Sequence, residues 1–478
     1  MRLGEEERKG GALAPGAEDV LRPDESAWRR EAAAVSLPEV HRSIMVPGKA
    51  PFWRKMLAFA GPGFLVAVGY MDPGNWATDL AGGAQFGYTL LAVILISNLM
   101  AILLQHLCVT LGVATGRDLA QACRDHYSTP TVWFLWVLCE LAIAACDLAE
   151  VVGSAIALQL LFGIPLVWGC IITCLDVLAV LYLQNRGFRM VEALVVVLIA
   201  TVGGCFAAEL FFAKPSITGV MLGFVPSAEI LKNQNMLYVS IGILGATVMP
   251  HNLYLHSSIV QTRNFERTPE GRREAIKFAT IDSSAALMFA LFINAAILIL
   301  AAATFYGTSH QDVASIQDAY HLLSPTLGVG IASTLFALAL LASGQNATLT
   351  GTLAGQIVME GFLNFRITPW LRRLITRGIA IVPAVCVIGF YGESKTTELL
   401  VASQVVLSMQ LGFAVVPLLR FTSEKGKMGE FVNPLWIKIL GWTTAVIIIT
   451  LNVKLLFDIF APEPVRKAFY GFLGLPME

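Results

Sequence analysis

The chain contains a succession of apolar stretches that are long enough to cross a lipid bilayer as helices. A spanning helix needs about 20 predominantly apolar residues, and eleven segments of the sequence come close to this length. Backbone groups inside lipid must pair among themselves, which favours helices. The sequence therefore predicts an all-α polytopic membrane protein with about 11 transmembrane helices. The predicted spans are 57–84, 88–113, 131–161, 164–183, 189–213, 237–262, 275–305, 328–362, 376–391, 397–420 and 435–458.

The composition agrees with this interpretation. Of the 478 residues, 56% are hydrophobic and only 14% are charged, whereas about a quarter of the residues of a soluble domain are charged. The net charge of -1 and the absence of a basic stripe give no reason to expect a nucleic-acid partner. No obligate protein partner is inferred. The eight cysteines, Cys146 among them, lie mostly in apolar runs and are interpreted as small core residues.

Positive charges orient the spans. Lysine and arginine gather in alternate connections, at 49–55, 117–124, 263–273, 366–373 and 420–427, while the connection 306–327 has none. Connections rich in these residues remain in the cytoplasm. We therefore expect a cytoplasmic N-terminus, an extracytoplasmic C-terminus and a place in the cell inner membrane. The polar residues 1–52 lack the apolar core of a secretory signal and are expected to form a disordered cytoplasmic tail.

Two spans carry matching interruptions. The first contains "DPGN" at 72–75 and the sixth contains "MPHN" at 249–252. Proline removes a backbone donor and clashes with the preceding turn, and glycine lets the chain unwind. We therefore expect helix breaks at Pro73, Gly74 and Pro250.

The two interrupted spans lie five spans apart and so enter the membrane from opposite sides. This arrangement predicts a five-plus-five inverted repeat, with a broken first helix in each half. The first repeat would comprise residues 53–213 and the second 237–420, with an additional span at 435–458.

The broken segments predict a binding site. Unwound backbone at mid-membrane depth is tolerated only where it lines a cavity or site, and an acid such as Asp72 costs about 3 kcal/mol there. Asp72 and Asn75 offer oxygen atoms, residues near Gly69 and Ala246 offer carbonyls, and Met249 offers a thioether. Sulfur favours transition metals over hard cations. The alternatives are that Asp72 caps the following half-helix and that Met249 fills the core.

The third span carries three acids, Glu140, Asp147 and Glu150. Glu140 and Asp147 are nearly two helical turns apart and share a face, and Glu150 follows one turn later. Several acids in one apolar helix are typical of a proton relay. For Glu140 an ion pair with Arg372 or Arg373 is the alternative.

Several stretches together resemble one family over nearly all of the chain beyond the tail. They are "FAGPGFLVAVGYMDPGNWATDLAGG", "CDLAEVVG", "GATVMPHNLYLHSS", "ASGQNATLTGTLAG" and "SQVVLSMQL". The chain is similar to the Nramp family of divalent transition-metal transporters. The resemblance implies the inverted-repeat fold of sodium-coupled amino-acid symporters, and inward transport of Mn²⁺ or Fe²⁺ together with protons.

The resemblance also implies roles for individual residues. The metal ligands would be Asp72, Asn75, Met249, the carbonyl of Ala246 and, in some conformations, Gln404. The proton pathway would contain Asp147 and Glu150, with His251 and His256 close by. For the histidines, packing, gating or a hydrogen bond between helices is the alternative. Gly412 stands where members usually have proline. Gly69 stands where they often have alanine, a change that would not affect a ligand that binds through its backbone carbonyl.

Three rival functions use the same residues differently. A sodium-coupled amino-acid symporter would hold Na⁺ and a carboxylate at the breaks, but an anion site would avoid an acid such as Asp72. A membrane metalloenzyme is disfavoured by only seven histidines and by the lack of an HExxH box. A channel is the third rival, and counterflow of the cargo that depends on a proton gradient would distinguish a carrier from it. We therefore expect no enzyme activity and no resident cofactor, with the metal ion as cargo.

Overall fold

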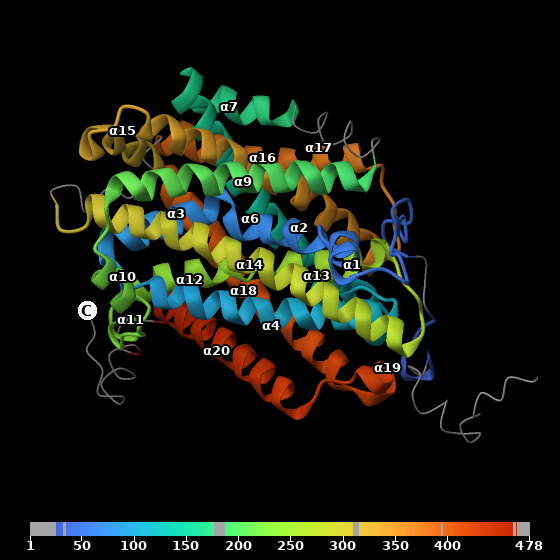
Figure 1. The fold of residues 1–478 in the computed structure, drawn as a ribbon. Helices are drawn as coiled ribbons and strands as arrows, with labels where there is room; N and C mark the ends of the chain where they lie inside the picture. Colours follow the sequence, from blue (N-terminus) through green and yellow to red (C-terminus); the bar gives the residue numbers. More distant parts are fainter. Residues whose placement is uncertain are drawn as a thin grey trace, which may run out of the picture.

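The computed structural model describes residues 25–31, 35–175, 187–308, 315–392, 395–461 and 465. Long helices lie side by side along one direction (Figure 1). The long uninterrupted helices are α4 (Leu91–Thr115), α6 (Thr129–Phe162), α9 (Phe188–Ala213), α14 (Pro269–Phe305), α16 (Ala332–Leu363), α17 (Pro369–Tyr391), α18 (Thr396–Ser423) and α20 (Leu435–Phe460).

The two predicted broken spans are each built from two half-helices. The first consists of α2 (Pro62–Val68), the 3₁₀ turn η2 (Gly69–Met71) and α3 (Pro73–Phe86), and the second of α12 (Gln234–Thr247) and α13 (Pro250–Ile259). They form the centre of the bundle, because α3 packs on α12, α14 and α18, and α13 packs on α4 and α16.

Shorter elements connect the long helices. They are η1 (Glu25–Ala27), α1 (Phe52–Phe59), α5 (Leu119–His126), α7 (Leu166–Ile172), η3 (Thr173–Leu175), α10 (Ile217–Gly223), α11 (Glu229–Lys232), η4 (Val260–Thr262), α15 (Ile316–Leu327), α19 (Lys425–Met428) and η6 (Gly429–Phe431). Two short strands, β1 (Ile44–Met45) and β2 (Arg263–Asn264), pair in parallel.

The prediction of an all-α polytopic membrane protein is confirmed. A helix lies at each of the eleven predicted spans, although only residues up to 175 of the fourth are described. Seven helical segments of the described chain are long and apolar enough to cross a bilayer by themselves. The seven include the broken sixth span, but not the first span, α16 or α17. The protein is thus a multi-pass membrane protein.

The described part of the N-terminal tail differs from the expectation of disorder. Residues 25–31 and 35–48, which we call the N-terminal strap, lie against the bundle end at which α4, α13, α16 and α18 terminate. Trp28 is 6% exposed. Its ring packs on Phe421, with the Arg117 guanidinium 4.7 Å from the ring centroid.

Polar contacts also fasten the strap. The Ser36 hydroxyl donates to Asp118 Oδ2 at 2.6 Å, and the Leu37 backbone N–H donates to Glu360 Oε2 at 3.0 Å. β1 then pairs with β2, directly after η4. A polar composition predicted disorder, but one buried tryptophan and a few side-chain acceptors on the bundle suffice to order the segment.

Trp28→Ala should release the strap, because truncating a buried aromatic side chain removes about 3 kcal/mol or more of packing energy. We expect limited proteolysis of the purified protein between residues 29 and 48 to become at least roughly tenfold faster. Trp53, which is 75% exposed, provides the matched control. Equal cleavage rates for wild type, Trp28→Ala and Trp53→Ala would show that the strap is not held by Trp28.

Candidate metal site

The first break leaves Asp72 at the start of a half-helix. Asp72 has extended backbone angles (φ −68°, ψ 165°), and Pro73 is the first residue of α3. Asp72 Oδ1 accepts a hydrogen bond from the Asn75 backbone N–H at 2.8 Å. The capping role that the sequence left open is therefore present.

The second break is built in the same way. α12 ends at Thr247, Val248 and Met249 are non-helical, and Pro250 begins α13. In both breaks the proline is the first residue of the second half-helix, where a backbone N–H would have no hydrogen-bond partner within the helix. The predicted breaks at Pro73 and Pro250 therefore coincide with the start of the second half-helix in each span.

Three oxygen atoms from the two breaks converge on one side chain. Asn75 Nδ2 donates to Asp72 Oδ1 at 2.8 Å, to the carbonyl of Gly69 at 3.1 Å and to the carbonyl of Ala246 at 3.2 Å. Oxygens that surround an amide nitrogen can equally surround a cation. The Asn75 amide would then have to turn its own oxygen toward the ion.

The sulfur of Met249 lies beside these oxygens. Met249 is fully buried, and its Sδ is 3.1 Å from the position that a Cβ on Gly69 would occupy. The same Cβ would lie 2.1 Å from Asn252 Nδ2. An alanine at residue 69 would thus displace the Asn252 side chain. The lack of a side chain at Gly69 therefore matters for packing, in addition to the position of its carbonyl oxygen.

Gln404 of α18 reaches the first break through Gly74. A Cβ on Gly74 would lie 1.7 Å from Gln404 Nε2, and Gln404 Oε1 is buried without a hydrogen-bond partner among the described residues. Gly74 lies within the first turn of α3 rather than in the break. Gly74 therefore does not unwind the helix. Its lack of a side chain lets the Gln404 amide approach the start of α3, next to Asp72.

α6 contacts the first break along one face. A Cβ on Gly153 would lie 2.1 Å from the Pro73 Cβ, so α6 and the start of α3 touch closely. Cys146 Sγ is 4.0 Å from Asp72 Oδ2 and 3.8 Å from Glu150 Oε1. The sequence analysis treated Cys146 only as a core residue. Its position one residue before Asp147 and four before Glu150 was the available signal.

A buried arginine organises the acids of α6. Arg377 of α17 is fully buried; its Nη2 is 3.3 Å from Glu150 Oε2, and its Nη1 donates to the Asp147 carbonyl at 3.3 Å. Thr348 of α16 also donates to Glu150 Oε2, at 3.3 Å. The sequence analysis missed Arg377, although an arginine inside an apolar span is itself a signal of function or pairing.

The other predicted proton-pathway residues are placed separately. Glu140 forms an ion pair with Arg372 at 3.0 Å, which is the alternative that the sequence left open. His256 Nδ1 contacts Gln105 Oε1 at 3.0 Å, in a hydrogen bond between α13 and α4. His251 is 2% exposed and interacts electrostatically with Asp147. His251 and Glu140 both lie within electrostatic range of Asp147, but Glu140 is also paired with Arg372 and His256 with Gln105.

Two further buried acids hold the first broken helix in place. Asp282 Oδ2 accepts from the Gly63 N–H at 2.7 Å at the start of α2. Glu192 pairs with Arg263 at 2.6 Å, and Arg263 also donates to the carbonyls that end α1. These contacts are structural.

Within the described ranges, no group of three or more His, Cys, Asp and Glu side chains could hold a metal ion. A site at the breaks must therefore combine Asp72 with an amide, a thioether and carbonyl oxygens. Such a mixed donor set suits a transition metal that is bound reversibly.

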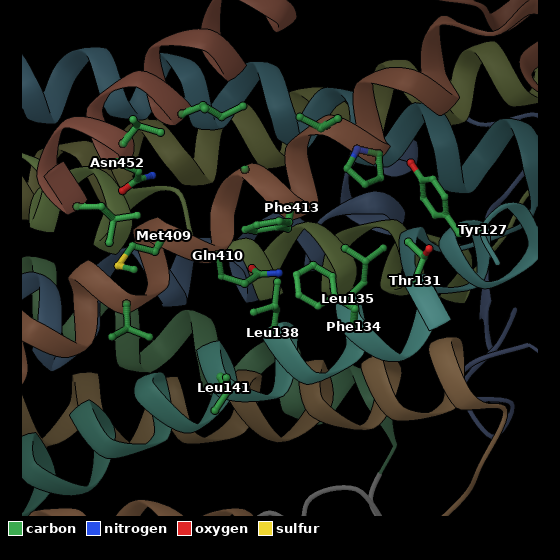
Figure 2. Close-up of a pocket in the computed structure, with 17 residues that line it drawn as sticks. Tyr127, Thr131, Phe134, Leu135, Leu138, Leu141, Met409, Gln410, Phe413 and Asn452 are labelled. Atoms are coloured by element: carbon green, nitrogen blue, oxygen red, sulfur yellow. The ribbon is translucent and has the colours of Figure 1, made fainter. Parts of the chain in front are cut away.

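A large apolar pocket lies elsewhere. It has a volume of about 730 Å³ and lies between α6, α18 and α20 (Figure 2). Its walls are mainly leucine, valine and phenylalanine side chains, including Leu138 and Phe413, and Gln410 is one of few polar groups there. A dication in such surroundings would lack ligands, so this pocket is not the candidate metal site.

Comparison with known proteins identifies the family of the chain. A family model described as natural resistance-associated macrophage protein-like (Nramp) matches residues 63–458. The chain belongs to the Nramp family. It is 68% identical to the divalent metal cation transporter MntH of Nostoc sp., over 88% of this chain and 95% of that protein. It is 62% identical to MntH of Listeria monocytogenes, over 90% of this chain and 96% of that protein.

Solved structures support the same assignment. The manganese transporter of Eremococcus coleocola, in complex with an aromatic bis-isothiourea compound, is 41% identical and has a TM-score of 0.83, covering 92% of this chain and 95% of its own. MhsT in complex with L-phenylalanine shares only 14% identity at a TM-score of 0.55, covering 83% of this chain and 98% of its own. The latter likeness shows the fold alone. These relatives are named as transporters, in agreement with the expectation that this Nramp protein is not an enzyme.

Gly74→Ala should destabilise this Nramp protein, because the new methyl group overlaps Gln404 and overpacking of a tight contact costs about 1–3 kcal/mol. We expect a lower midpoint of thermal unfolding, followed by tryptophan fluorescence in detergent. Gly204→Ala on α9 is the matched control, since a Cβ there meets no atom within 4 Å. An unchanged midpoint for Gly74→Ala would contradict the close contact.

Proposed function

We propose that the protein imports divalent transition metal, Mn²⁺ and also Fe²⁺, together with protons by alternating access. It would act in the cell inner membrane with a cytoplasmic N-terminus and an extracytoplasmic C-terminus. The described N-terminal strap and the end of α20 lie at opposite ends of the bundle (Figure 1), as this orientation requires. The family membership and the names of the MntH relatives support the cargo class.

One observation carries the proposal. Oxygens of Asp72, Gly69 and Ala246 converge on the Asn75 amide, with the Met249 sulfur buried against Gly69. A carboxylate supplies charge, carbonyl oxygens replace water, and a thioether selects against hard ions. The ligand residues would be Asp72, Asn75, the carbonyl of Ala246, Met249 and Gln404.

The surroundings explain how the ion would be held only transiently. Asp72, Asn75, Ala246, Met249 and Gln404 are each at most 1% exposed, so bound cargo would lose most of its hydration. Asp72 supplies a single negative charge against two positive ones. Burial strengthens this attraction, and the incomplete charge balance favours release once a path opens.

Protons would move through the acids of α6. A dication beside Asp72 favours the loss of a proton from neighbouring acids. Asp147 and Glu150 lie on the same helix as Cys146, which contacts Asp72, and Arg377 stabilises a charged Glu150. We propose Asp147 and Glu150 as the main carriers, assisted by His251. Glu140 and His256 would act through their partners Arg372 and Gln105.

A sodium-coupled amino-acid symporter is the second candidate, and only the shared fold favours it. The thioether at the break and the lone carboxylate of Asp72 favour a metal ion instead. Competition between cations in proteoliposomes separates the two functions.

Met249→Ala should reduce selectivity more than transport. In proteoliposomes with a pH gradient, we expect Ca²⁺ to compete with Mn²⁺ uptake at least roughly tenfold better in this variant, because the soft donor is lost. Met190→Ala serves as the control, because Met190 on α9 is 49% exposed. If Ca²⁺ competes equally in wild type and Met249→Ala, the thioether does not set selectivity.

Asp147→Asn should uncouple protons from metal. An asparagine amide, unlike a carboxylate, cannot take up and release a proton. Mn²⁺-driven acidification, measured with a dye inside the liposomes, should therefore fall severalfold more than Mn²⁺ uptake. Glu398→Gln, at an exposed acid on α18, is the control. Full acidification by Asp147→Asn would remove this residue from the proton pathway.

A further inference from the structure

Cys146 occupies a position that an ordinary core cysteine does not need. Its thiol is 3% exposed and lies between two carboxylates, 4.0 Å from Asp72 Oδ2 and 3.8 Å from Glu150 Oε1. It also belongs to a small buried cluster with Ala142, Met249 and Leu407. Two sulfur atoms and the Asp72 carboxylate therefore gather at one place.

We propose that Cys146 is a selectivity-determining residue, which adds a second sulfur donor to the cargo site and gives it high affinity for thiophilic dications such as Cd²⁺. This inference rests on the proposed function, because it takes the helix breaks to be the metal site. It extends that function by naming a class of ion that the Met249 thioether alone would hold less tightly.

The geometry suits shared coordination. For Zn²⁺, metal–sulfur bonds are about 2.3 Å and metal–oxygen bonds about 2.0–2.2 Å, and bonds to the larger Cd²⁺ ion are longer. One ion bound to both Cys146 Sγ and Asp72 Oδ2 at an angle between tetrahedral and somewhat wider would separate these atoms by about 3.6–4.0 Å. The observed separation is 4.0 Å, so little movement of either side chain is required.

The chemistry favours discrimination among dications. Thiolate is a much softer ligand than carboxylate or amide oxygen, and it raises the affinity for soft ions more than for Mn²⁺. A cysteine binds metal as the thiolate, so the S–H bond breaks as the sulfur–metal bond forms. The proton would pass to the Glu150 carboxylate, whose Oε1 faces the sulfur at 3.8 Å from the same helix.

Cys139 provides a matched comparison on the same helix. It is as deeply buried as Cys146 and lies two turns earlier, near Glu140 and its partner Arg372. Replacing either cysteine by serine changes one atom and preserves volume. Cys386, which is exposed, is replaced by serine in every protein tested, so that Cd²⁺ does not bind there.

The test uses the purified full chain and Cd²⁺ alone as the probe. Binding is followed by the ultraviolet sulfur-to-cadmium charge-transfer band and by calorimetry. We expect the band in the parent protein and in Cys139→Ser, and its disappearance in excess Mn²⁺. In Cys146→Ser the band should be lost and the Cd²⁺ affinity should fall at least about tenfold, with Mn²⁺ affinity changed less than about threefold.

Three results would overturn the inference. They are a band that persists in Cys146→Ser, a band that excess Mn²⁺ does not displace, and a parallel loss of Cd²⁺ and Mn²⁺ affinity in both Cys146→Ser and Cys146→Ala. The thermal midpoint of each variant shows whether it is folded, and Cys146→Ala serves if the serine variant is not. Failure of the parent protein to transport Mn²⁺ would instead contradict the proposed function. The Cd²⁺-binding results would still decide separately whether Cys146 binds the ion.

Discussion

The structure depends on one constraint, which is that polar backbone atoms released inside a bilayer must find partners. Each break frees carbonyl oxygens at the centre of the bundle, and lipid cannot satisfy them. In this chain the freed carbonyls of Gly69 and Ala246 both turn to the Asn75 amide, which Asp72 also contacts. The same oxygens that would destabilise an isolated helix are the ones that we propose as cation ligands. On that proposal, the two helix breaks and the cation site have one structural origin.

Buried charge follows the same logic. Arg377 pairs with Glu150, and Arg263 pairs with Glu192, because a buried charge without a partner is costly. Asp282 is satisfied by backbone N–H groups at the start of α2. Asp72 has no cationic partner among the described residues; its carboxylate accepts hydrogen bonds from Asn75 and contacts the Cys146 thiol. A carboxylate left in this way is suited to a transient cation rather than to a permanent partner.

Much of the fold could be predicted from the sequence, because its main signals are local. The lengths of the apolar runs predicted the helices, and Pro73 and Pro250 marked the breaks to within one residue. Charge alternation and proline spacing do not report tertiary contacts, however. They could not show that Trp28 is buried against Phe421, that Gly74 makes room for Gln404, or that Glu140 selects Arg372. Those outcomes depend on which helices become neighbours.

The contact between Gly153 and Pro73 has a mechanical consequence. The proline ring fills the space where a side chain of α6 would otherwise stand, so the helix that bears Asp147 and Glu150 rests directly on the hinge of the first broken span. Neither element can tilt far without pushing the other. On the proposed function, a displacement that begins near Asp72 would push α6 through this contact, and α6 carries Glu150 one turn and Asp147 nearly two turns from Gly153.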